Sequence, residues 1–278
     1  MLRTETDGHR ADRFAFGRNW RSFAALVDDA RIEAAGDSLL GPLGRADLAG
    51  CAFLDVGCGS GLFSLAAHRL GARVRSFDFD PDSVAAAAGL RDRFAPGSDW
   101  LIEQGSILDA GFAEALGTYE IVYAWGVLHH TGDLWGAMDA TSRLVAPGGL
   151  LYVSVYNDQG PRSRRWWRVK RRYNRSGPLT RRLLLAGSAA YLARRLPLRL
   201  LERLVRPAAR VPAGQVRARG MSAWHDLLDW VGGFPFEVAR PEEVFDFLRA
   251  RGFALRRMTT CGGGLGCNEF VFERSHGG

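Results

Sequence analysis

Three closely spaced glycines and one aspartate are the residues of this 278-residue chain best suited to hold a ligand. Gly57, Gly59 and Gly61 alternate with small residues, and Asp78 ends the next apolar run. Glycine has no Cβ, so it tolerates positive φ and lets a ligand touch the backbone. A carboxylate at the tip of a neighbouring strand can accept hydrogen bonds from both hydroxyls of a ribose. The spacing therefore predicts a site for a ligand that carries a ribose.

The flanking sequence predicts the elements that position these residues. Residues 52–56 form an apolar run with the length of a buried strand, and residues 62–70 carry apolar side chains at helical spacing. Gly71 ends that helix, and residues 72–77 read as a second strand. The free N–H groups at the start of the helix would point at the ligand. The order is strand, glycine loop, helix, strand and acid.

The loop spacing separates two families of nucleotide-binding domains. Dinucleotide enzymes use G-x-G-x-x-G, whereas Leu62 stands here at the place of the third glycine. The segment 55–61, DVGCGSG, resembles motif I of the class I S-adenosylmethionine-dependent methyltransferases, and Asp78 matches the ribose-binding acid of that family. The alternative is a tight strand-to-helix turn in an unrelated α/β domain. The resemblance implies that S-adenosylmethionine is the cofactor and S-adenosylhomocysteine the product.

The rest of the chain continues the alternation of strand and helix. Further strands are predicted at 100–104, 120–125, 150–156, 253–259 and 268–273, with helices at 81–94, 134–144 and 241–251. Such alternation indicates a parallel sheet with right-handed crossovers. The segments APGG at 146–149 and WGVLHH at 125–130 also resemble the family, so the resemblance covers 51–157. It implies a Rossmann-like methyltransferase fold: an α/β protein with a seven-stranded, mostly parallel sheet and a helical cap inserted after the fifth strand.

The sequence divides into four segments under this interpretation. Residues 1–50 form an N-terminal helical lid, 51–157 the cofactor-binding core, 158–238 a basic and aromatic cap, and 239–278 the completion of the sheet. Residues 261–267, CGGGLGC, are expected to turn between the last two strands at the sheet edge.

The predicted cofactor site collects residues from the carboxyl ends of the strands, where ligands of such sheets bind. The family often places an acid after the third strand to read the adenine amino group, but Ser106 is the first polar side chain there. The backbone of Ser106 and Ile107 is therefore expected to contact adenine. The full set is Asp55, Gly57, Cys58, Gly59, Gly61, Asp78, Phe79, Ser106, Ile107 and Trp125.

His129 and His130 are the candidate catalytic residues, because they follow the fourth strand and an unperturbed histidine titrates near neutrality. A base is needed only where the methyl acceptor is a hydroxyl or a protonated amine. Alternatively, His130 caps the following helix or packs structurally. Asp158 and His225 are further candidates for the base. No ligand spacing among the acids and histidines supports a metal site.

Aromatic and basic residues outside the core suggest a substrate site. The stretch 13–20, RFAFGRNW, is interpreted as a lid that faces the site, with packing on the sheet edge as the alternative. Forked arginine donors suit carboxylate or phosphate, and aromatic walls suit a flat body. We therefore expect an anionic or polar ring-bearing acceptor. The predicted substrate set is Phe16, Asn19, Trp20, Tyr156, Asn157, Arg165, Arg168 and His225.

The charge of the chain is unevenly distributed. The net charge is +7, yet residues 160–220 alone carry +17 and the remainder −10. Such a basic segment with interleaved Trp and Tyr could grip phosphates and stack bases, so an RNA methyltransferase remains an alternative. Leucines within 183–204 flanked by arginines also resemble a membrane-surface helix. Further alternatives are a solvated arginine face and a cofactor binder without catalysis; a small-molecule acceptor is favoured over nucleic acid or membrane.

Composition limits the class of protein further. A chain of 278 residues with 47% hydrophobic content can bury a large core. No apolar run reaches the roughly 18 residues that a membrane span needs, and the first 30 residues show no secretion signal. The 4 cysteines lack CxxC spacing, so reduced thiols and a cytoplasmic location are expected. The oligomeric state is left open.

Overall fold

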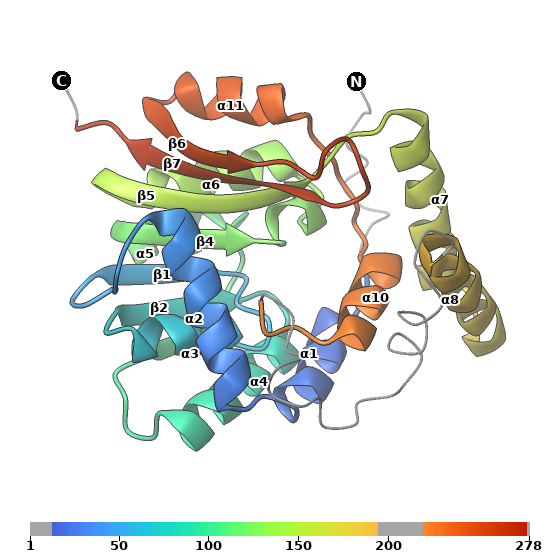
Figure 1. Cartoon of the computed structure of the whole chain (residues 1–278), viewed down its shortest axis with the longest axis horizontal. Helices are drawn as coiled ribbons and strands as arrows, with labels where there is room; N and C mark the ends of the chain where they lie inside the picture. Colours follow the sequence, from blue (N-terminus) through green and yellow to red (C-terminus); the bar gives the residue numbers. More distant parts are fainter. Residues whose placement is uncertain (1–12, 194–218, 277–278) are drawn as a thin grey trace.

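The computed structural model describes residues 13–193 and 219–276 and shows a single central sheet between helices (Figure 1). The sheet has seven strands in the order β3-β2-β1-β4-β5-β7-β6. Only β7 runs against its neighbours, β5 and β6. The predicted mostly parallel, seven-stranded fold is thereby confirmed. The strands are β1 (Ala52–Val56), β2 (Arg73–Asp78), β3 (Leu101–Gln104), β4 (Tyr119–Trp125), β5 (Val145–Tyr156), β6 (Phe253–Thr259) and β7 (Cys267–Arg274).

Successive side chains of the central strands enter opposite layers of the core. Phe53 of β1 packs in a cluster with α2, α3 and α4, whereas Leu54 packs in a second cluster with α5, α6 and α11. This alternation follows from the pleat of a strand that is buried on both faces. The helices are α1 (Phe16–Ala24), α2 (Asp29–Leu43), α3 (Leu62–Arg69), α4 (Pro81–Phe94), α5 (Ala110–Leu116), α6 (Leu134–Arg143), α7 (Pro161–Arg175), α8 (Pro178–Ala193), α10 (Ala223–Gly232) and α11 (Pro241–Arg249).

The Pro147-Gly148-Gly149 segment, expected as a turn before the fifth strand, lies inside β5. A Cβ on Gly149 would lie 2.9 Å from the carbonyl oxygen of Glu120, so glycine lets the two strands approach closely there. The pairing of β4 with β5 shifts register between Tyr119 and Ile121 at the same level. The strand therefore begins five residues earlier than the pattern indicated and absorbs the glycines as an irregularity.

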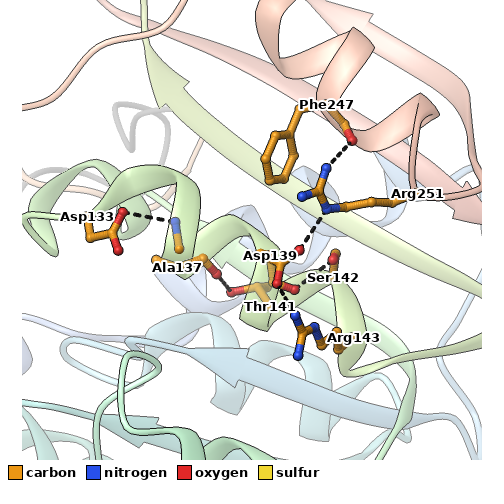
Figure 2. A network of polar contacts seen from close by, with 9 residues as sticks. Asp133, Ala137, Asp139, Thr141, Ser142, Arg143, Phe247 and Arg251 are labelled. Atoms are coloured by element: carbon orange, nitrogen blue, oxygen red, sulfur yellow. Dashed lines mark hydrogen bonds and ion pairs between the residues drawn. The ribbon is translucent and has the colours of Figure 1, made fainter. Parts of the chain in front are cut away.

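An ion-pair network joins the two helices that cover the α6 side of the sheet (Figure 2). Asp139 of α6 accepts a hydrogen bond from Arg251, just beyond α11, at 2.7 Å, and it also pairs with Arg143. The bond from Arg251 lowers the pKa of the Asp139 carboxyl. Arg251 also donates to the Phe247 carbonyl oxygen at 3.0 Å and lies over that ring. This network attaches α11 to α6.

The chain leaves the core after β5 and returns to it before α11 at neighbouring points. Asn157 and Ala239 form a parallel β-bridge, and Asp158 donates to the Ala239 carbonyl oxygen at 3.1 Å. Between these points lie α7, α8 and α10, at the end of the sheet towards which β4 points and beside α1 (Figure 1). The predicted apolar stretch beyond residue 193, including Leu196, Leu200 and Leu204, lies outside the described residues.

Candidate functional site

The glycine loop connects β1 to α3 and has the strained backbone that its sequence predicts. Gly57 has a φ of +67° and Gly59 a φ of +56°, a region that other residues rarely adopt. A Cβ on Gly57 would lie 2.5 Å from the Val127 side chain. The Cys58 N–H donates to the Phe77 carbonyl oxygen at 3.0 Å, which ties the loop to β2. The loop thus lies at the carboxyl ends of β1 and β2, with the Val127 side chain packed against Gly57.

Asp78 ends β2 and faces this loop. Its two carboxylate oxygens accept backbone N–H groups, one from Gly59 and one from Asp80, both at 2.9 Å. Burial raises the pKa of Asp78 to about 6, although both hydrogen bonds oppose that rise. The structure therefore brings together the two most specific parts of the predicted motif.

Asp55 lies in β1, just before the glycine loop, and its side chain bonds to the helix that follows the loop. Its side chain is buried and accepts a hydrogen bond from the Ser64 hydroxyl at 2.6 Å, so it anchors the first turn of α3. Burial raises the pKa of Asp55 to about 7. Cys58 is also buried, and burial raises the pKa of its thiol well above the usual value. Both belong to the predicted cofactor set, and the side chains of both are buried in the protein.

The next edge of the site follows β2 and β3. The Gly105 N–H donates to the Asp78 carbonyl oxygen at 3.0 Å, which places Ser106 and Ile107 next to the acid. The Ser106 hydroxyl accepts the Leu108 N–H at 3.2 Å, and Ile107 is buried. Phe79 is 51% exposed, so its ring can contact a ligand from the solvent side.

Helix α1 lies across the glycine loop. The Trp20 indole is so close that a Cβ on Gly59 would lie 3.0 Å from it. The Gly17 N–H donates to Asp80 at 2.8 Å, and Arg21 pairs with Asp82 at 2.8 Å. These contacts attach α1 to the start of α4, directly behind Asp78.

The other face of α1 contacts α10. The Asn19 amide donates to the Asp229 carboxylate at 2.7 Å and to the His225 carbonyl oxygen at 3.1 Å. His225 is buried against the Phe23 ring, with centroids 5.6 Å apart, and its Nε2 lies 3.3 Å from the Ser22 hydroxyl. The contacts of His225 are therefore with α1, and the structure does not bring its ring to the histidine pair.

The histidine pair occupies a short 3₁₀ turn after β4. The rings of His129 and His130 have centroids 4.4 Å apart, and Tyr156 packs 4.1 Å from His129. Phe16 from α1 lies 4.9 Å from His130. Burial and the nearby positive charge of Lys170 lower the pKa of His130 to about 3. Burial also lowers the pKa of His129 well below its usual value, so both rings are neutral at physiological pH.

The tautomer of His130 follows from its neighbour. Its Nδ1 lies 2.6 Å from the Pro235 carbonyl oxygen, which can only accept a hydrogen bond. Nδ1 of the neutral ring must therefore carry the proton, and Nε2 keeps its lone pair. His129 is 1% exposed, which leaves His130 as the member of the pair better placed to meet a substrate.

Lys170 is a functional candidate that the sequence reasoning missed. It is fully buried, and its Nζ lies 4.9 Å from the Trp230 ring, 4.7 Å from Phe236 and 5.4 Å from Tyr156. It donates to the Trp230 carbonyl oxygen. Burial lowers its pKa to about 7, against the attraction of Asp229. The available signal was that Lys170 is the single lysine in a chain that otherwise uses arginine. Of these two side chains, only lysine loses its proton in a protein.

The predicted arginines lie elsewhere. Arg165 and Arg168 are exposed on α7. Arg165 lines an open cavity of about 480 Å³ together with Asn157, Asp158 and Arg162. Asn157 also accepts a hydrogen bond from Asn268 at 3.0 Å. Among the described residues, no hydrogen bond, ion pair or ring contact links these arginines to the histidine pair.

Trp125 ends β4 and is covered by a second residue that the sequence reasoning missed. The Arg219 guanidinium lies 3.5 Å from the centroid of the Trp125 ring and 4.5 Å from that of Phe63. Its Nη2 donates to the Tyr123 hydroxyl at 2.7 Å. Nothing in the local sequence marks Arg219, since it is one of many arginines in a basic segment.

Within residues 13–193 and 219–276, no helix is long and apolar enough to cross a membrane. In the same part of the chain, no group of three or more His, Cys, Asp or Glu side chains is arranged to hold a metal ion.

Comparison with known proteins adds a family match. Residues 22–187 match the family described as "Methyltransferase domain". The chain is 38% identical over 115 residues to a ubiquinone biosynthesis O-methyltransferase of Xanthomonas oryzae pv. oryzae, which is 41% of this chain and 46% of that relative. The chain thus matches less than half of the length of this curated relative.

Two solved structures have a similar fold. Magnesium protoporphyrin IX methyltransferase from Synechocystis PCC 6803, with bound S-adenosylhomocysteine, is 16% identical with a TM-score of 0.50 and covers 88% of this chain and 84% of its own. An O-methyltransferase family protein from Burkholderia thailandensis is 16% identical with a TM-score of 0.52 and covers 89% of this chain and 56% of its own. At these identities the likeness concerns the fold alone.

Proposed function

The chain belongs to the class I S-adenosylmethionine-dependent methyltransferases, and on that premise we propose that it methylates an oxygen or nitrogen of a small molecule. The observation that carries the proposal is Asp78, which lies against the positive-φ glycine loop with both carboxylate oxygens directed at backbone donors. Each carboxylate oxygen keeps a further lone pair with which it can accept a ribose hydroxyl.

The residues of the loop edge fit this cofactor. Asp78 would accept the ribose hydroxyls, the backbone at Ser106 and Ile107 would face adenine, and the backbone of the loop 57–61 would contact the amino-acid part. When bound, S-adenosylmethionine supplies a methyl group on a sulfonium, and the protein's part is to orient the acceptor and exclude water. Trp20 is placed to cover this edge.

The acceptor wall that we propose is built from Phe16, His130 and Tyr156. Their rings come from α1, the turn after β4 and the end of β5, and they contact one another. His130 presents an unprotonated Nε2 that can accept a proton or orient a hydroxyl. Since burial holds its pKa at about 3, it is a weak base and suits an acceptor whose proton is already acidic, such as a phenol.

The four-segment organisation of the chain is part of the proposal. We propose that 1–50 acts as the lid, 158–238 as the cap, and 51–157 with 239–278 as the core. The contacts of α1 with α4 and α10 support a lid, and the position of α7, α8 and α10 beside the carboxyl ends of the strands supports a cap. The four free cysteines agree with action in the reducing cytoplasm.

Calorimetric titration with S-adenosylhomocysteine tests the proposal. We expect stoichiometric binding by the wild-type chain and a loss of about 2–4 kcal/mol for Asp78→Ala, because two charged hydrogen bonds disappear. Asp99→Ala is the matched control, since Asp99 is exposed and forms no hydrogen bond or ion pair among the described residues. Equal affinity of wild type and Asp78→Ala would remove the ribose assignment.

One observation favours a second candidate acceptor. Helix α7 exposes Arg164, Arg165, Arg168 and Arg172, and α8 exposes Leu179 at 72% and Leu183 at 66%. Such a surface suits an anionic macromolecule or a membrane better than a small metabolite. Salt-dependent retention on RNA would support the nucleic-acid alternative, and pelleting with anionic liposomes would support the membrane alternative.

A further inference from the structure

Among the described residues, Arg219 is a cation without an ion-pair partner at the edge of the glycine-loop site. Its guanidinium lies over the rings of Trp125 and Phe63, and its one hydrogen bond within the described residues goes to the hydroxyl of Tyr123. A guanidinium has five N–H donors. Within the part of the chain that the structure describes, no carboxylate oxygen lies within the 4.0 Å of an ion pair with Arg219.

The acids around Arg219 already have other partners. Glu269 accepts a hydrogen bond from the Tyr152 hydroxyl at 2.6 Å, and Asp55 accepts one from Ser64 at 2.6 Å. The Tyr123 hydroxyl is neutral, because burial raises its pKa above the usual value. A partly buried arginine is normally paired with an anion, so this arrangement lacks a negative charge that a ligand can supply.

A second unused donor lies in the same stack. The Nε1 of Trp125 is buried and has no hydrogen-bond partner in the structure. Buried polar groups are nearly always bonded, so an orphaned donor beside an underused guanidinium indicates an acceptor that arrives from outside the chain. The two observations are independent, since one concerns an ion pair and the other a neutral donor.

The location ties this pair to the ligand site. Asp55 of β1 is paired with Tyr123 of β4, so Trp125 stands at the level of Gly57 in the adjoining strand. Phe63, the second ring that the guanidinium contacts, belongs to the first turn of α3, which follows the glycine loop. Arg219 comes from the segment between β5 and α11 and reaches back across the sheet to this point.

We propose that Arg219 binds the carboxylate of a small molecule held at the glycine loop. A planar, forked guanidinium fixed on an aromatic ring is suited to bidentate recognition of a carboxylate, which lysine cannot reproduce. The inference rests on the proposed function, because that function supplies two sources of the group: the amino-acid end of S-adenosylmethionine and an acidic methyl acceptor. In either case Arg219 links the cap segment to the bound ligand.

The experiment compares two nucleosides that differ in the carboxylate. S-adenosylhomocysteine carries the amino-acid end, and 5′-methylthioadenosine lacks it. Arg219→Met keeps apolar contact with both rings. In calorimetric titration we expect this variant to bind S-adenosylhomocysteine at least tenfold more weakly than wild type and to bind 5′-methylthioadenosine with unchanged affinity. Arg219→Lys should recover only part of the loss. Arg182→Met, at an exposed position on α8, is the control and should match wild type.

The second arm concerns the acceptor. If both nucleosides bind Arg219→Met as they bind wild type, the carboxylate of the acceptor is the expected ligand. The KM of an acidic acceptor should then rise at least tenfold, with no change for its methyl ester.

Two results overturn the inference. One is wild-type behaviour of Arg219→Met in both arms. The other is an equal loss of affinity of Arg219→Met for both nucleosides, which indicates that Arg219 has a structural role in the attachment of the cap segment. Failure of the wild-type chain to bind S-adenosylhomocysteine would overturn the proposed function and this inference together.

Discussion

Individual side chains of the site have unusual pKa values because they are buried. Asp78 and Asp55 have raised pKa values, and Lys170 has a lowered one. Each shift has the direction that desolvation imposes, since burial disfavours the charged form. Activity and stability should therefore depend on pH within the range where the enzyme works.

Cofactor affinity should fall as pH decreases from 7 to 5. Ribose hydroxyls donate to the ionised form of Asp78, whose pKa without ligand is about 6, so binding below that pH requires the loss of a proton. Titration calorimetry in buffers of different ionisation enthalpy will show proton release at pH 5.5 and little at pH 8. Asp78→Asn should bind more weakly at pH 8 and show a flatter pH dependence. A wild-type affinity that does not change over this range would contradict the assignment.

Lys170→Met should change how stability depends on pH. In the unfolded chain lysine titrates near 10.5, whereas burial lowers the pKa of folded Lys170 to about 7. Between these values the unfolded chain binds more protons, so the contribution of Lys170 to stability rises with pH and is lost as pH falls through 7. Thermal unfolding at pH 7 and pH 9 should show that rise in wild type and in Arg168→Met. Parallel behaviour of Lys170→Met and wild type would refute the lowered pKa.

At the scale of elements, helix α1 joins the cofactor edge to the acceptor wall. One side of it touches Asp80 and Gly59, the other touches Asp229, and Phe16 reaches His130. The sequence predicted that Phe16, Asn19 and Trp20 of this helical segment face the site. It could not predict that Asp229 is the partner of Asn19. That contact joins residues far apart in the chain, through an insertion that has no local signal for its position.

Gly59→Val should abolish cofactor binding while the fold persists. The residue has positive φ, and a side chain there would meet the Trp20 indole at 3.0 Å in the space that faces the ligand. Gly50→Val is the matched control for backbone strain, because Gly50 has a φ of +71° and no atom within 4 Å of an added Cβ. Calorimetry should find binding by the control alone, with circular dichroism unchanged for both. Normal binding by Gly59→Val would show that the loop does not contact the ligand.

Gly17→Ala should loosen α1 from the core. An added Cβ would lie 2.5 Å from Asp80, so the helix must move away and the hydrogen bond from Gly17 to Asp80 must lengthen. We expect faster hydrogen exchange in α1, a shift of Trp20 fluorescence and weaker cofactor binding. Gly41→Ala is the control, since nothing lies within 4 Å of a Cβ at Gly41. Unchanged exchange in α1 of Gly17→Ala would contradict the role of this contact.

For the molecule as a whole, the architecture could be predicted from local sequence patterns, whereas parts of the candidate site depend on tertiary contacts. The seven strands and the glycine loop follow from periodicity and from glycine chemistry, both of which are written in adjacent residues. Lys170 and Arg219 acquire their environments only when the inserted segment folds against β4 and β5. The sequence reasoning selected Arg165 and Arg168 because they flank a tryptophan pair, yet both point to the outer surface of α7.

The arginines of α7 still permit a test at this scale. Arg165 lines the open cavity beside Asn157 and Asp158, whereas Arg168 lies outside it. If an anionic acceptor enters through this cavity, Arg165→Ala should raise its KM several-fold at low salt and Arg168→Ala should raise it less. Removal of a fully solvated arginine changes little. The measurement is the KM of the acceptor at two salt concentrations, with Arg182→Ala as the control variant. A KM equal to that of wild type in all three variants would contradict this route.

The β-bridge between Asn157 and Ala239 has a consequence for how such proteins diversify. Because the chain departs from the core and rejoins it at hydrogen-bonded neighbours, the whole intervening stretch can be treated as a cassette. Its replacement by another sequence can leave β5 and α11 in place, provided the two junction residues keep their pairing. Acceptor preference can then change by exchange of one contiguous piece, as long as the new piece restores the contact that Arg219 makes with Trp125 of the core.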